Sequence, residues 1–158
     1  MLRLSDAGVR YVVAGGVAVV LHGVERVTLD LDLAVDFAPD NLARFLAVMQ
    51  ELGLKPRAPV APDFLLDTEA VRAAVREKKA IVFCFIHPGD PLCSVDVFLR
   101  EDLSYDALSA DATTVAVEGR NISVVSKQRL LNMKQAIHPP RSKDQMDMQE
   151  LKRLLAHE

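Results

Sequence analysis

Short runs of apolar, β-branched residues alternate along this chain with stretches in which apolar residues recur at every third or fourth position. The first pattern is typical of buried strands, and the second is typical of helices that bury one side. Prolines within 54–66 indicate a loop or an edge strand, because proline cannot donate to a sheet ladder. The sequence therefore predicts strands over 11–14, 29–35, 80–87, 93–99, 113–117 and 121–125, the last four as two hairpins, and helices over 17–21, 39–52, 69–78, 102–108, 126–137 and 141–155.

The length and composition indicate one ordinary globular unit. With 158 residues, half of them hydrophobic and 26% charged, we interpret 1–158 as a single domain. The N-terminus lacks a signal-peptide pattern, and no apolar run approaches the roughly 20 residues needed to cross a bilayer. We therefore expect a cytoplasmic protein with no membrane segment. The two cysteines, Cys84 and Cys93, have no partners at metal-binding spacing and are expected to be reduced.

The segment from Tyr11 to Asp36 carries the features that point to chemistry. A strand ending at Ala14 runs directly into Gly15 and Gly16 and then into a short helix. Two glycines at a helix N-terminus leave backbone N–H groups exposed, with no side chains to block an approaching phosphate. A tight turn without a ligand is the alternative interpretation. His22, at the end of the short helix, is expected to cap or pack rather than to catalyse.

Two acidic residues, Asp30 and Asp32, lie in the next predicted strand. The period of a strand places both carboxylates on one face, while Leu29, Leu31 and Leu33 take the other. Close carboxylates repel each other unless a cation lies between them, and Mg²⁺ takes such oxygen ligands together with substrate phosphates. The alternative interpretation is the solvated face of a half-buried strand.

Charged residues also fall among apolar ones near the C-terminus. Ser126 is predicted to cap the helix over 126–137, and Lys134 falls inside the apolar arc of that helix. Asp144 and Asp147 project onto the apolar face of the last predicted helix. Because buried charges are normally paired, these groups either clamp the two helices together or hold Lys134 toward nucleotide phosphates. Both interpretations remain open at this point, and they are compatible.

Taken in order, the motifs Gly-Gly, His-Gly, Arg-x-Thr and Asp-x-Asp resemble the core of the nucleotidyltransferase superfamily, which includes DNA polymerase β and the tRNA CCA-adding enzymes. The identity and order of these motifs are most similar to those of small nucleotidyltransferases related to abortive-infection toxins. In those proteins a Lys-Asp-x-x-Asp run like that from Lys143 to Asp147 is common. The resemblance spans nearly the whole chain. It implies an α+β nucleotidyltransferase fold, with a mixed β-sheet, helices packed mainly on one face and a C-terminal helical pair.

The resemblance also implies a third carboxylate on a later strand beside the first pair. Asp96 in Ser-Val-Asp-Val-Phe is the match, and an acid between two valines is costly to bury unless it is paired or bound to a cation. Taken alone, Asp96 would be assigned to the exposed face of an edge strand that it shares with Ser94. Together with Asp30 and Asp32, we predict that it is the third metal ligand.

The family resemblance implies transfer of a nucleoside monophosphate from a nucleoside triphosphate to an acceptor hydroxyl. Asp30, Asp32 and Asp96 would be catalytic and would hold two Mg²⁺ ions, with Mn²⁺ as a substitute. The predicted nucleotide-binding residues are Gly15, Gly16, Arg26 and Lys134.

The acceptor is left open, because related enzymes act on tRNA ends, on protein hydroxyls or on small molecules. The net charge of −3 disfavours a broad nucleic-acid surface. Residues 127–153 nevertheless hold seven basic and three acidic residues, an asymmetry that favours binding of a single nucleotide. A toxin–antitoxin partner is a further expectation from the resemblance. The alternative function is a nucleotide-binding or partner-binding module of the same fold with little catalysis.

Overall fold

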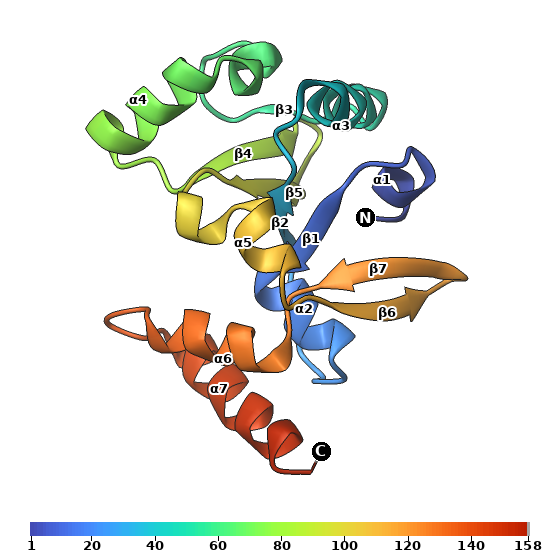
Figure 1. Ribbon diagram of the computed structural model, residues 1–158, viewed down its shortest axis with the longest axis vertical. Helices are drawn as coiled ribbons and strands as arrows, with labels where there is room; N and C mark the ends of the chain where they lie inside the picture. Colours follow the sequence, from blue (N-terminus) through green and yellow to red (C-terminus); the bar gives the residue numbers. More distant parts are fainter. Residues whose placement is uncertain (158) are drawn as a thin grey trace.

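The computed structural model describes residues 1–157 and has a seven-stranded mixed sheet at its centre (Figure 1). The strand order is β3-β4-β5-β2-β1-β7-β6. β5 runs parallel to β2 and β7 runs parallel to β1, whereas the other neighbours are antiparallel. The strands are β1 (Tyr11–Ala14), β2 (Asp30–Val35), β3 (Lys55–Pro56), β4 (Val82–His87), β5 (Asp90–Phe98), β6 (Thr113–Val117) and β7 (Arg120–Val124).

Helices connect these strands and surround the sheet, which confirms the predicted α+β fold class. The α-helices are α1 (Leu2–Asp6), α2 (Gly15–Leu21), α3 (Pro39–Glu51), α4 (Thr68–Lys78), α5 (Tyr105–Ser109), α6 (Lys127–Gln135) and α7 (Ser142–Leu155). Two short 3₁₀ helices are η1 (Pro62–Leu66) and η2 (Glu101–Leu103). Within residues 1–157, none of these helices is long and apolar enough to cross a membrane.

One face of the sheet is apolar and is covered by α3 and η1. Phe45 of α3 is fully buried and meets Phe85 of β4 edge-to-face, with ring centroids 5.7 Å apart. Phe64 of η1 stacks on Phe83 of β4 at 5.5 Å. Because residues of a strand alternate between faces, this packing turns Cys84 and its neighbours on β5 toward the opposite face. That opposite face remains available for polar side chains.

Turn chemistry accounts for several predicted boundaries. Gly53 follows α3 with φ +69°, as expected of a left-handed helix end. The predicted hairpin of β6 and β7 turns through Glu118 and Gly119, which both have positive φ. Residues Lys55–Pro56 form the edge strand β3, as the proline content predicted.

Other boundaries differ from the prediction. α2 begins at Gly15 rather than at residue 17. α4 begins at Thr68 rather than at residue 69, and its N-cap is Asp67, whose Oδ1 accepts the Ala70 N–H at 3.0 Å. Leu29 precedes β2 and is 54% exposed, so the prediction that it lies in this strand, on the face opposite the acids, was wrong.

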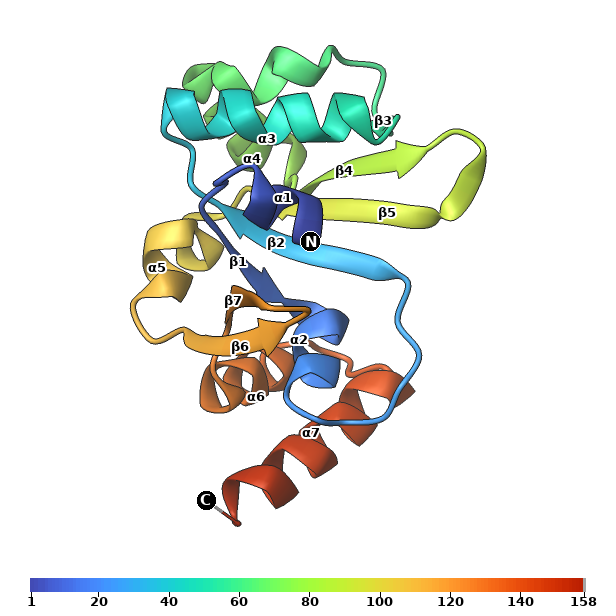
Figure 2. The same cartoon turned by 90° about the vertical axis from the view of Figure 1, so that its right-hand side faces the viewer.

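The predicted C-terminal helical pair is present as α6 and α7, which pack against each other below β1 and β7 (Figure 2). Oγ of Ser126 accepts the Arg129 N–H at 3.2 Å, which confirms Ser126 as the cap of α6. Figure 2 also shows the long connection from α2 to β2 passing beside α7. The fold thereby brings the last helix next to the segment that follows the diglycine turn.

Candidate active site

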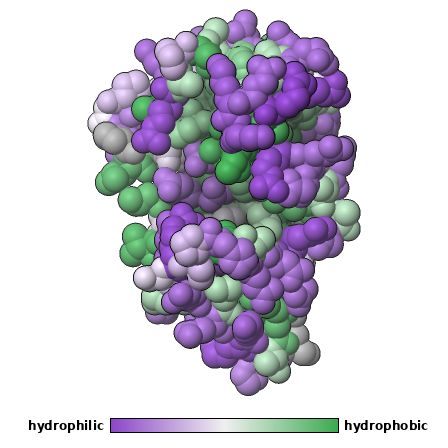
Figure 3. All heavy atoms as spheres, turned by 90° about the vertical axis from the view of Figure 1, so that its left-hand side faces the viewer, coloured by the Kyte–Doolittle hydropathy of each residue, from purple (hydrophilic) through white to green (hydrophobic). Residues whose placement is uncertain are grey.

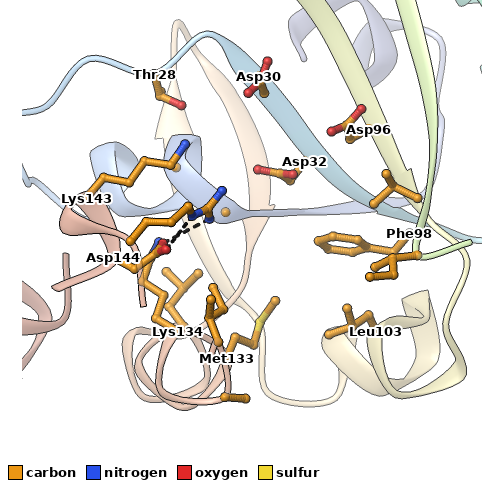
Figure 4. A pocket seen from close by; sticks show the side chains of 18 of the residues that line it. Thr28, Asp30, Asp32, Asp96, Phe98, Leu103, Met133, Lys134, Lys143 and Asp144 are labelled. Carbon is orange, nitrogen blue, oxygen red and sulfur yellow. Dashed lines mark hydrogen bonds and ion pairs between the residues drawn. The ribbon is translucent and has the colours of Figure 1, made fainter. Parts of the chain in front are cut away.

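The centre of the site is a pair of carboxylates on adjacent parallel strands. Asp32 of β2 pairs in register with Asp96 of β5, and two residues earlier Asp30 pairs with Ser94. Since side chains alternate along a strand, Asp30, Asp32 and Asp96 project from the same face of the sheet (Figure 4). The structure therefore brings together the three carboxylates that the sequence singled out.

The diglycine turn is built against this pair. A Cβ on Gly15 would lie 1.8 Å from Oδ2 of Asp32, and the φ of Gly15, +59°, also favours glycine. A Cβ on Gly16 would lie 2.4 Å from Oγ1 of Thr28. The Gly16 N–H donates to the Asp32 carboxylate. Both glycines are therefore required by close approach of the carboxylate strand and the segment that leads into it.

Asp32 is largely buried and lies beside two other carboxylates. Burial, followed by the negative charges of Asp96 and Asp30, raises the pKa of Asp32 to about 6. The hydrogen bond from Gly16 and the charge of Lys134 oppose this rise without cancelling it. A buried carboxylate next to two others is the electrostatic setting in which proteins bind cations.

The other two carboxylates differ in their partners. Oγ of Ser94 donates to Oδ1 of Asp30 at 2.6 Å, whereas Oδ1 of Asp96 is buried without a hydrogen-bond partner. Cys84 pairs in register with Asp96, and burial together with that acid raises the pKa of the thiol to about 12. Across residues 1–157, no three His, Cys, Asp or Glu side chains form a preassembled metal cage. The carboxylates thus share a face, and Oδ1 of Asp96 is a buried acceptor that receives no hydrogen bond from the protein.

A buried network of ion pairs joins this face to the C-terminal helix. Oδ2 of Asp147 accepts from Nη1 of Arg26 at 2.5 Å and from Nζ of Lys134 at 2.6 Å. Oδ1 of Asp144 lies 3.2 Å from the same Nζ, and Nε of Arg141 donates to Oδ2 of Asp144 at 2.7 Å. Asp144 and Asp147 are 0% and 3% exposed. The predicted clamp between the last two helices is confirmed, and Arg26 belongs to it.

The carboxylate face and all members of this network except Asp147 line one pocket of about 680 Å³. In Figure 4 the carboxylates form one side, Lys143 and the cations near Asp144 form a second, and Phe98, Leu103 and Met133 form a third. The pocket borders every residue that the sequence predicted for the site, namely Gly15, Gly16, Arg26, Asp30, Asp32, Asp96 and Lys134.

Phe98, Arg141 and Lys143 are among the residues of the pocket that the sequence interpretation did not assign to the site. Phe98 follows Asp96 by two residues, so strand period places both on one face, and this signal was available. Arg141 was assigned only to the start of the last helix, although its spacing of three from Asp144 permits an ion pair. Lys143 was noted only as part of a motif.

His22 is structural, as predicted. It ends α2, and its Nε2 lies 2.8 Å from the carbonyl oxygen of Val125. This bond connects α2 to the chain just before α6.

A mixed sheet with paired carboxylates beside a diglycine helix start defines the nucleotidyltransferase fold, and solved structures agree. The crystal structure of the lincosamide antibiotic adenylyltransferase LnuA, lincomycin-bound, is similar with a TM-score of 0.62 and 18% identity, covering 94% of this chain and 89% of that chain. An antigenic nucleotidyltransferase-like protein from Paracoccidioides brasiliensis is similar with a TM-score of 0.56 and 20% identity, covering 99% of this chain and 82% of that chain. At these identities the likeness shows the fold alone.

The family is shown by the sequence itself. Residues 1–151 match the model of the aminoglycoside-2''-adenylyltransferase family, and the chain belongs to this family. The protein is therefore a nucleotidyltransferase, which confirms the predicted superfamily and enzyme class. Among curated proteins, none matches the chain.

Proposed function

We propose that this enzyme transfers a nucleoside monophosphate, with adenylyl as the leading candidate, from a nucleoside triphosphate to a hydroxyl group of a small molecule. The observation that carries the proposal is the in-register pair Asp32 and Asp96 facing the Gly15–Gly16 turn. The family description and the name of LnuA favour an antibiotic-like acceptor. Acceptors such as tRNA or protein, and a toxin–antitoxin partner, remain predictions from the sequence resemblance.

The donor set fits a hard divalent cation. Asp30, Asp32 and Asp96 supply only oxygen ligands, and they project from one face of the sheet. These residues would hold Mg²⁺ or Mn²⁺, which would supply positive charge to the triphosphate and lower the pKa of the acceptor hydroxyl. The raised pKa of Asp32 supports this assignment, because a bound cation would offset both the burial and the repulsion from Asp96 and Asp30 that raise it.

The opposite side of the pocket suits the triphosphate. Arg26, Lys134, Arg141 and Lys143 line it, and the acids that neutralise them are Asp144 and Asp147. Two positive charges remain in excess. With the backbone of the diglycine turn, this excess supports binding of the β- and γ-phosphates.

The chemistry then requires a group that takes a proton from the acceptor. In the proposed reaction the acceptor oxygen bonds to the α-phosphorus, the bond from that phosphorus to the bridging oxygen breaks, and pyrophosphate leaves. We assign the acceptor's proton to Oδ1 of Asp96, because this oxygen has no other partner. Asp32, held by the Gly16 N–H, keeps its fixed orientation beside it.

The proposal is tested with α-³²P-labelled ATP, Mg²⁺, and a panel of aminoglycosides and lincosamides. We expect a labelled product with the wild type, a loss of at least about a hundredfold with Asp32→Asn or Asp96→Asn, and no change with the control Asp63→Asn on the exposed surface of η1. Omission of the divalent cation should abolish transfer.

If labelled nucleotide binds but no acceptor in the panel, nor any component of a cell extract, is labelled, the chain is better described as a nucleotide-binding module. Labelling of RNA or protein in the extract would support nucleotidyl transfer but would show that the acceptor is a macromolecule and not a small molecule.

A further inference from the structure

The three carboxylates of the site are held in different ways. Asp32 is largely buried and accepts the Gly16 N–H, and Oδ1 of Asp96 is buried. Asp30 is exposed at the first residue of β2 and lines the pocket, and the molecule is hollowed between its two halves on the face drawn in Figure 3. An exposed carboxylate is not fixed by packing, so its orientation depends on its hydrogen bonds.

One hydrogen bond supplies that orientation. Oγ of Ser94 lies 2.6 Å from Oδ1 of Asp30, a length typical of a hydroxyl that donates to an ionised carboxylate. Among residues 1–157, no other hydrogen bond or ion pair reaches the Asp30 side chain, so Oδ2 has no protein donor. A bond to one oxygen restricts the rotation of the carboxylate and leaves the second oxygen for another ligand.

The donor is fixed more firmly than the acceptor. Ser94 lies within β5, where its backbone pairs with Asp30 of β2 on one side and with Ile86 of β4 on the other. Asp30, by contrast, begins β2, and the preceding residues 24–29 contain no helix or strand. Strand period places Ser94 on the same face as Asp96, two positions later. An inner strand of the sheet therefore carries both the third carboxylate and the group that orients the first.

We infer that Ser94 is a positioning residue for nucleotidyl transfer: its hydroxyl holds Asp30 in one orientation, in which Oδ2 is available to the divalent cation. This inference rests on the proposed function. A ligand group that adopts the competent orientation only part of the time lowers the apparent affinity by that fraction. Removing a hydrogen-bond partner of a metal-binding carboxylate accordingly costs about 10–100-fold in metal affinity or activity.

The test measures cation binding without nucleotide, by electron paramagnetic resonance of free Mn²⁺ in titrations of the whole chain. Ser94→Ala should raise the dissociation constant of Mn²⁺ at least about tenfold, whereas Ser94→Thr keeps a hydroxyl and should stay within about threefold of the wild type. The control is Ser123→Ala, which changes a half-buried serine of β7 whose side chain makes no hydrogen bond within residues 1–157. It should bind Mn²⁺ like the wild type, and circular dichroism confirms that each variant is folded.

Equal Mn²⁺ affinities of Ser94→Ala and the wild type would overturn the inference and leave the proposed function intact. A wild type that binds no Mn²⁺ would overturn the inference together with the cation site of the proposed function.

A second measurement separates positioning from a structural role. With labelled ATP and the acceptor panel, Ser94→Ala should be about tenfold slower than the wild type at limiting Mn²⁺ and should recover to within about twofold when Mn²⁺ is saturating. Ser123→Ala should match the wild type at both concentrations. A loss in Ser94→Ala that persists at saturating Mn²⁺ would show that Ser94 does not act by holding Asp30 for the cation, and the inference would fail.

Discussion

Arg26 and Asp147 are 121 positions apart in sequence, yet Nη1 of Arg26 lies 2.5 Å from Oδ2 of Asp147. The same oxygen accepts from Lys134 at 2.6 Å, so one buried carboxylate orients two cations that line the pocket. The segment after the diglycine turn, α6 and α7 therefore meet at a single atom. The last helix therefore forms part of the pocket wall, through Lys143 and Asp144.

Replacing Asp147 with alanine should lower the free energy of unfolding by roughly 3–5 kcal/mol, because Arg26 and Lys134 would be left buried without their shared acceptor. Urea denaturation followed by circular dichroism measures the change. Asp63→Ala, an exposed acid on η1, serves as the control and should change the value by less than about 0.5 kcal/mol. Equal stabilities of the two variants would show that the network contributes little.

Gly15→Ala should abolish transfer, whereas Gly8→Ala should not. The two glycines have similar φ angles, +59° and +65°, so an alanine at either position carries a backbone penalty of about 1–2 kcal/mol. Only at Gly15 does the new Cβ overlap Asp32, while at Gly8 nothing lies within 4 Å. Displacing a catalytic carboxylate by about 1 Å costs on the order of a hundredfold in rate.

Comparing kcat for these two variants separates steric overlap from backbone strain. A similar loss of activity in both would mean that strain, and not the position of Asp32, limits the rate. The melting temperatures of both variants, compared with that of the wild type, measure the backbone strain separately from activity.

The sequence predicted the carboxylate face because strand period is a local rule. The spacing of Asp30 and Asp32 fixes their common face. The apolar residues between and after them indicate that the segment is a strand buried on its other face. The placement of Asp96 beside Asp32 depended on the family resemblance, since the pairing of β2 with β5 joins segments 64 residues apart in register. No local pattern specifies such a pairing.

Other features of the site could not be predicted, because they arise from tertiary contacts. Arg26 was expected to bind phosphate from its motif alone, and its pairing with Asp147 follows only from the docking of α7. Lys134 and the acids of α7 were predicted to pair because all three fall on apolar helix faces, and the structure adds that Lys134 contacts both Asp144 and Asp147. The inward direction of a side chain was predictable within one element, and a partner on another element was predictable only where both residues were buried charges.

Asp32→Asn should stabilise the protein at alkaline pH in the absence of divalent cations. The pKa of Asp32 is about 6 in the folded protein and 3.8 in the reference state, so the folded state binds the proton more tightly. The favourable contribution of this group is complete below about pH 4 and is lost as the pH rises through 6. With about two pKa units between the states, the variant should gain roughly 3 kcal/mol over the wild type at pH 8.

Urea denaturation between pH 4 and pH 8 measures this difference, which should shrink toward zero at the acidic end. Addition of Mg²⁺ should stabilise the wild type at pH 8 and leave the variant nearly unchanged, because the cation compensates the charge of Asp32. A stability difference that does not depend on pH would contradict the assigned pKa.

Lys143→Ala should weaken nucleotide binding without affecting stability. Lys143 is exposed, lines the pocket and has no ion-pair partner among residues 1–157, so its removal leaves no buried charge behind. Loss of one charged contact to phosphate should raise the KM for the triphosphate by about tenfold. Lys152→Ala, an exposed lysine farther along α7, is the matched control and should change neither the KM nor the melting temperature.

Lys134→Ala should behave differently, because Lys134 is buried and neutralises both Asp144 and Asp147. Its loss leaves two buried carboxylates with one cationic partner each, Arg141 and Arg26, and should lower the free energy of unfolding by roughly 3 kcal/mol. Urea denaturation and the KM for the triphosphate, measured on both lysine variants, distinguish a structural cation from a ligand-binding one. If Lys143→Ala destabilises the protein as much as Lys134→Ala does, the division of roles between the two lysines is wrong.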